Sequence, residues 1–135
     1  MTPRPQEHLY EKQYALELLK IAEGDLLSAQ VLNESKKGRR ENICFLSQQA
    51  IEKSLKAVLV WLQIPFPLVH DAGVLVAKMP PPLTPPLGYD LSVLTSYATV
   101  RRYEESRSIL TPESIKAVLD AGQSVLDWAK AQCQK

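Results

Sequence analysis

The chain has 135 residues, of which 45% are hydrophobic and 23% are charged. This composition is typical of one folded globular domain and excludes disordered, collagen-like and disulfide-rich classes. Because 16 lysines and arginines nearly balance 15 acids, no overall field attracts nucleic acid or an anionic membrane, and any such contact must be local. We expect a single domain over residues 1–135, with residues 1–10 as a flexible tail.

Targeting and metal-binding signals are missing from the sequence. The first nine residues contain two prolines and no apolar run, which does not fit a signal peptide. No stretch has the roughly 18 consecutive apolar residues of a membrane span. The two cysteines and two histidines show no metal-ligand spacing, and a disulfide is not expected. We therefore expect a cytoplasmic protein without a metal or other cofactor.

Two long helices are predicted in the first half of the chain. Apolar residues recur at three- and four-residue steps from Tyr14 to Leu32, and turn residues follow over 33–38. A second helical run covers residues 40–63 and ends before Pro65, since proline lacks the amide donor. Residues 55–62 are nearly all apolar, more than one bundle face requires. We expect this helix to be central and also to form a dimer interface, through Leu55, Leu59, Trp61 and Leu62.

Shorter signals predict the rest of the fold. Asp71 is a plausible cap for a short helix over residues 72–79, and five prolines between residues 79 and 88 predict a stiff, extended connection. A fourth helix is expected from residue 89 or 90 to about residue 107. Thr111, Pro112 and Glu113 then form the start of a fifth. The predicted class is all-α: an antiparallel up-and-down helical bundle of four long helices and one short helix.

Specific residues then resemble a known family. They are Ala22-x-x-Asp25-Leu26-x-x-Ala29 in the first helix, Phe45-x-x-Gln48-Gln49-Ala50-x-Glu52-Lys53-x-Leu55-Lys56-Ala57 in the second, and the later pairs His70-Asp71 and Arg102-Tyr103. In this order they resemble the HEPN domain over nearly the whole chain. The resemblance implies a five-helix bundle, usually a homodimer, often partnered with a small nucleotidyltransferase and associated with nucleotide or RNA binding.

One departure from the family concerns catalysis. Its ribonuclease members carry Arg, four to six residues, then His, which places a general acid or base beside a cation for the scissile phosphate. The nearest pair in this chain is Arg4 and His8, with three residues between them. Glu104 also follows Arg102-Tyr103 where the family often has Pro, and an acid there weakens a phosphate site. The sequence therefore favours a domain that is not an enzyme.

Three groups of residues are candidates for nucleotide or RNA binding, and each has a structural alternative. Donors on one side of the second helix could bind a phosphate or base, or could form a solvated face in which Glu52 pairs with Lys56. A histidine and an acid could form a base and its orienter, although a helix cap is the simpler role for the acid. An arginine and tyrosine group could grip a phosphate and stack on a base, or form an internal salt network. The three groups are Gln49, Lys53 and Lys56; His70 and Asp71; and Arg101, Arg102 and Tyr103.

The densest basic run is better explained by structure than by binding. Lys36, Lys37, Arg39 and Arg40 fall in the turn between the first two helices, where cations suit the end of a helix. We interpret this run as a solvated turn.

The function predicted from the sequence is a non-catalytic, HEPN-like dimeric domain that binds a nucleotide or RNA and acts as partner of a nucleotidyltransferase in a toxin-antitoxin-like module. Two alternatives remain open. One is a divergent ribonuclease toxin that uses His70 with Arg102 across the bundle. The other is a purely structural assembly domain without a ligand.

Overall fold

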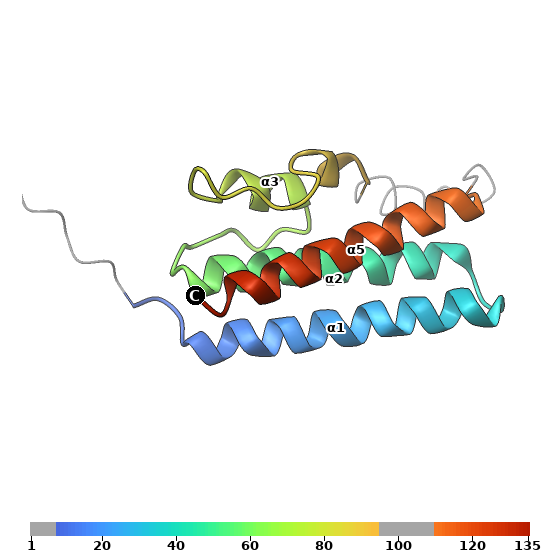
Figure 1. The fold of residues 1–135 in the computed structure, drawn as a ribbon, viewed down its shortest axis with the longest axis horizontal. Helices are drawn as coiled ribbons and strands as arrows, with labels where there is room; N and C mark the ends of the chain where they lie inside the picture. The colour runs from blue at the N-terminus through green and yellow to red at the C-terminus, as the bar shows by residue number, and fades with distance from the viewer. Residues whose placement is uncertain (1–7, 95–109) are drawn as a thin grey trace, which may run out of the picture.

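Long helices dominate the computed structural model, which describes residues 8–94 and 110–135 (Figure 1). Helix α1 spans Lys12–Ser35, α2 spans Arg40–Trp61, the short α3 spans Ala72–Ala77 and α5 spans Pro112–Gln132. Residues 90–94 are also helical and match the predicted start of the fourth long helix, whose remainder lies outside the described residues. No strand occurs in the described ranges, and the predicted all-α bundle is confirmed.

The helices begin where the capping residues predict. At the start of α5, Oγ1 of Thr111 accepts a hydrogen bond from the amide of Ser114 at 3.1 Å, and Pro112 takes the first helical position. At the start of α3, Oδ1 of Asp71 accepts one from the amide of Gly73 at 2.8 Å. These ends depend on contacts within one turn of helix, which is why local sequence is sufficient to predict them.

The long helices lie side by side. Helices α1 and α2 are antiparallel and α5 runs in the same direction as α2, so the α1–α2 turn and the start of α5 share one end of the bundle (Figure 1). This is the relation expected for the first, second and last long helices of an up-and-down bundle. Within the described ranges, each helix is too short or too polar to cross a lipid bilayer.

Helix α2 is the central helix, in contact with α1, α3 and α5. Its fully buried apolar residues include Ile51, Leu55, Val58, Leu59 and Val60. The wide apolar run is therefore covered within the chain itself, because neighbours pack on more than one side of α2. This burial corrects the dimer-interface prediction for Leu55 and Leu59, which have no exposed surface. Trp61 and Leu62, at the end of α2, are half-buried.

Helix α5 approaches α1 closely at Gly122. A Cβ atom on this residue would lie 2.9 Å from Cδ1 of Leu26, a buried side chain of α1. Gly122 belongs to the apolar stripe of α5 and is itself buried. The missing side chain therefore lets the two helices pack at short range.

Two connecting segments differ from the sequence expectation. The proline-rich connection is folded rather than extended: the amide of Leu83 bonds the carbonyl of Pro80 at 2.8 Å, and the amide of Gly88 bonds that of Pro85 at 3.0 Å. Proline favours such turns because it pre-sets φ for their second position. The end of the predicted flexible tail is also held, since Oε1 of Gln63 accepts from the amides of residues 9 and 10 at 2.7 and 2.9 Å.

Candidate functional site

A buried carboxylate on α2 organises the candidate site. The side chain of Glu52 is only 8% exposed, in a helix whose neighbouring positions form the apolar core. Nζ of Lys56, one turn later, donates to Oε1 of Glu52 at 2.6 Å. Because an isolated charge is costly to bury, Glu52 requires such partners. The predicted Glu52–Lys56 pair is present, but it is largely buried rather than part of a solvated face.

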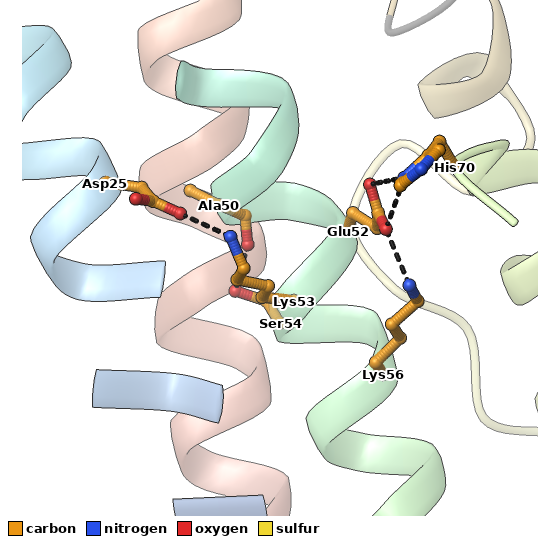
Figure 2. A network of polar contacts seen from close by, with 7 residues as sticks. All are labelled: Asp25, Ala50, Glu52, Lys53, Ser54, Lys56 and His70. Atoms are coloured by element: carbon orange, nitrogen blue, oxygen red, sulfur yellow. Dashed lines mark hydrogen bonds and ion pairs between the residues drawn. The ribbon is translucent and has the colours of Figure 1, made fainter. Parts of the chain in front are cut away.

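The second partner of Glu52 comes from the loop after α2. Nδ1 of His70 lies 2.9 Å from Oε1 and 3.1 Å from Oε2 of Glu52 (Figure 2). An ionised carboxylate only accepts hydrogen bonds, so Nδ1 donates, and Nε2 is left as the other polar atom of the ring. The His70 side chain is 83% exposed. The carboxylate therefore orients an imidazole that faces solvent.

An aromatic ring lies beside this cluster. Nζ of Lys56 is 5.9 Å from the ring centroid of Phe66, within the range of a cation–π contact. Phe66 in turn stacks on Tyr10 with ring centroids 5.9 Å apart. The cluster of Glu52, Lys56 and His70, which we call the Glu52 cluster, thus combines one anion, one cation, one imidazole and an adjacent aromatic ring.

The structure separates Lys53 from Lys56. Nζ of Lys53 donates to Oδ2 of Asp25 on α1 at 2.9 Å, and Figure 2 shows it pointing away from the Glu52 cluster. Lys53 therefore links α2 to α1, and its ammonium lies apart from that of Lys56. Gln49 is half-buried one turn before Lys53. The three donors grouped in the sequence do not form one binding surface.

Asp71 has a structural role in its observed position. Its Oδ1 accepts from the amide of Gly73, as described above, and also lies 3.2 Å from Oγ of Ser92, which donates to it. These contacts fix α3 to the helical start at residues 90–94. The capping interpretation of Asp71 is therefore the one that its contacts favour. The predicted site residues Arg101, Arg102 and Tyr103 lie outside the described residues.

The role of Glu52 is what sequence reasoning missed. The sequence showed that Glu52 and Lys56 are one turn apart, which is typical of an exposed helix pair. A usable signal was its spacing, three residues before Leu55 and seven before Leu59, which places Glu52 on a helix face with apolar residues. An acid on such a face is either buried with partners or at the edge of the core, and only the packing decides which.

Metal binding and thiol chemistry find little support in the described residues. Within residues 8–94 and 110–135, no three His, Cys, Asp or Glu side chains are grouped closely enough to hold a metal ion. Both cysteines are buried, and burial raises the pKa of each thiol from 9.0 to about 11, with Glu41 adding to the effect at Cys44. A thiol of that pKa is a poor nucleophile near neutral pH.

The exposed apolar side chains of the long helices lie mainly on α1. Its outer face carries Leu16, Ile21, Leu27 and Val31, each between 44% and 60% exposed. At the end of α2, Trp61 and Leu62 are half-buried, and Nζ of Lys12 lies 4.1 Å from the centroid of the Trp61 ring. Partly exposed apolar side chains therefore occur both at the end of α2 and along α1.

Comparisons with known proteins agree with the helical fold. The model of the HEPN domain family matches residues 15–132. The crystal structure of an archaeal HEPN homologue matches with a TM-score of 0.57 and 22% sequence identity, covering 88% of this chain and 97% of that chain. At this identity the structural likeness shows a shared fold alone. None of the curated proteins matches the chain.

Proposed function

The chain belongs to the HEPN domain family, and from that premise we propose that it is a non-catalytic, dimeric HEPN domain that binds a nucleotide or RNA through the Glu52 cluster. The observation that carries the proposal is the buried Glu52 carboxylate, which holds an ammonium and an exposed imidazole on one side of α2. The ammonium donates hydrogen bonds of the kind that phosphates accept, and Nε2 of the imidazole is a second polar atom for the ligand.

Each member of the cluster has a defined part in this binding. Lys56 supplies the positive charge for a phosphate oxygen, and the exposed His70 ring supplies a donor or acceptor for a second contact. Phe66, which lies beside Lys56 and stacks on Tyr10, is proposed as an apolar neighbour of the base. Glu52 does not touch the ligand in this scheme, because its oxygens already accept from Lys56 and His70. Arg102 and Tyr103, assigned by the family resemblance, are proposed as further contacts.

A calorimetric titration tests the proposal. Purified protein is titrated at fixed salt with ATP and with a short single-stranded RNA, and the wild type is compared with Lys56→Met, His70→Ala and Arg102→Ala. We expect measurable binding of at least one ligand by the wild type and weaker binding by Lys56→Met and His70→Ala. No heat from either ligand would leave an assembly domain without a ligand as the better description.

A second candidate function, a divergent ribonuclease, is favoured by the orientation of His70. A carboxylate at Nδ1 holds the imidazole in the tautomer whose Nε2 accepts a proton, which is the arrangement of a general base. In this scheme His70 takes the proton of an RNA 2′-hydroxyl as its oxygen bonds the adjacent phosphorus and the bond from phosphorus to the 5′-oxygen breaks. The leaving 5′-oxygen takes a proton from solvent, and Arg102 stabilises the charge of the phosphate. RNA cleavage by the wild type that is lost in both His70→Ala and Glu52→Gln supports this function. Cleavage that survives His70→Ala eliminates it.

The proposal includes a homodimer. HEPN domains commonly dimerise, and Trp61 and Leu62 keep exposed apolar surface at the end of α2. We propose this end of α2 as part of the dimer interface. A buried tryptophan is among the side chains that contribute most to protein interfaces, so Trp61 is its expected anchor.

The proposal also includes a protein partner. We propose that the dimer docks onto a small nucleotidyltransferase in the cytoplasm, in a toxin-antitoxin-like module, as the family resemblance implies. Chemistry would then reside in the partner, which fits the absence of the Arg-x4-6-His motif from the sequence. Co-expression with a nucleotidyltransferase encoded beside this chain tests it, with co-elution expected and separate elution contradicting it.

A further inference from the structure

A cavity of about 360 Å³ is lined by residues of the α1–α2 turn and of the start of α5. These two segments lie at the same end of the bundle (Figure 1). Its lining combines three cations, Lys36, Lys37 and Arg40, with the apolar residues Leu32, Ile43 and Ile115. No acid is among its lining residues. Its volume falls within the range of about 300 to 1,000 Å³ found for small-molecule sites.

Among the residues that the structure describes, no acid pairs with the cations of this cavity. Within the described residues, Lys36 and Lys37 form no ion pair. The nearby acid Glu41 instead pairs with Arg39 at 3.5 Å, and neither residue lines the cavity. Uncompensated cations around a concave surface attract anions more strongly than cations on a flat, mixed surface. The basic run is therefore more than a solvated turn.

The backbone gathers these side chains. Lys36 has φ 56° and Gly38 has φ 86°, so the chain reverses within a few residues and α2 begins at the cavity. Gly38 adopts a positive φ without strain because it has no side chain. Lys36 has no such advantage, but its positive charge is favourable at the C-terminal end of α1. One N–H group of Arg40 donates to the carbonyl of Leu110, which holds the guanidinium at the cavity.

We propose that this cavity binds the phosphate groups of a nucleotide or of an RNA strand. The three cations donate hydrogen bonds to phosphate oxygens, and the apolar lining residues contact the less polar part of the ligand. Arg40 and Glu52 are twelve residues apart on α2, or about 18 Å at the rise of an α-helix. The cavity is therefore a separate site from the Glu52 cluster, and the inference holds whether or not that cluster binds a ligand.

Binding measurements with matched double variants test this site. The wild type, Lys36→Gln/Lys37→Gln and the control Lys20→Gln/Lys78→Gln are titrated with pyrophosphate, ATP and a short single-stranded RNA. All four lysines are exposed and both double variants remove two charges, but only the first changes the cavity. We expect the cavity variant to bind about tenfold more weakly, with a shallower salt dependence for RNA, and the control to change less than about twofold.

The ligands distinguish the two sources of phosphate. A loss seen with all three probes supports a site for the phosphate group itself, and a loss confined to RNA supports an RNA backbone site. Equal losses in the cavity variant and the control, or no binding of any probe by the wild type, overturn the inference. The Lys56→Met variant separates this result from the proposed function, because it changes the Glu52 cluster and leaves Lys36, Lys37 and Arg40 unchanged. A loss of binding in Lys56→Met alone is assigned to the Glu52 cluster, and a loss in the cavity variant alone is assigned to the cavity.

Discussion

Nδ1 of His70 lies 2.9 Å from Oε1 of Glu52, although the two residues are 18 positions apart in the chain. The contact ties the loop after α2 to the middle of that helix, and the same carboxylate holds Lys56 at 2.6 Å. The same buried acid therefore contributes to the stability of the fold and positions both proposed ligand contacts. Replacing any of the three groups changes the surroundings of the other two.

Glu52→Ala is expected to lower the free energy of unfolding by about 3 kcal/mol, because it leaves the largely buried Lys56 ammonium without its partner. Urea denaturation followed by circular dichroism measures the change. The chain offers a matched control in Lys116 and Asp120, which also lie one turn apart and 2.6 Å from each other but are 77% and 64% exposed. Asp120→Ala should cost less than about 0.5 kcal/mol. Equal costs at the two pairs would show that burial of Glu52 has no energetic role.

Lys56→Met is expected to weaken nucleotide or RNA binding by about tenfold, the effect of losing one charged hydrogen bond. Lys53→Met is the control, because it removes the same charge from the same helix at a side chain that pairs with Asp25. Titrations of both variants at the same salt concentration measure the difference. A larger loss in Lys53→Met than in Lys56→Met would place the ligand elsewhere on α2.

Asp71→Ala is expected to destabilise the protein by about 1 kcal/mol through loss of the α3 cap, with ligand affinity unchanged. Asp71→Asn should restore most of the stability, since asparagine also caps helices. Denaturation and titration of both variants provide the two measurements. Loss of binding in both variants, with stability retained, would instead make Asp71 a ligand contact.

Trp61→Ala is expected to weaken the homodimer by about 2 kcal/mol or more, because this half-buried side chain lies at the proposed interface. Leu55→Ala should leave the dimer intact and lower stability by about 3 kcal/mol, since Leu55 is fully buried in the core. Sedimentation velocity over a range of concentrations measures the association.

A third variant identifies the interface if the end of α2 is not part of it. Leu27 is 60% exposed on the outer face of α1, and Leu27→Glu adds a charge there without disturbing the core. A dimer that survives Trp61→Ala but dissociates in Leu27→Glu would move the interface to α1.

The buried thiols predict a loss of stability in alkali. Burial raises the pKa of Cys44 and Cys133 from 9.0 to about 11, so the unfolded chain releases these protons at lower pH than the folded one. Between pH 9 and about 11 the unfolded state binds fewer protons, and stability therefore falls as pH rises through this window. Denaturation at several pH values should show a smaller fall in Cys44→Ala/Cys133→Ala than in the wild type. Identical pH profiles would contradict the raised values.

Local sequence was sufficient to predict the helices α1, α2, α3 and α5. Thr111, Asp71 and Pro65 act on backbone groups within about one turn, so their effects on helix ends do not depend on the rest of the chain. The three- and four-residue spacing of apolar side chains likewise identifies the buried face of α1 before any partner is known. Together with the family motifs, these features established an all-α bundle from the sequence by itself.

Only the tertiary structure decided what the polar residues do. Glu52 is buried because neighbouring elements pack around α2, and its contact with His70 spans 18 positions. The same packing assigned Leu55 and Leu59 to the core, turned Lys53 toward Asp25 and brought the start of α5 to the basic turn. Spacing along a helix shows which side chains share a face. Which faces are covered, and by what, depends on contacts between residues distant in sequence, which no local pattern contains.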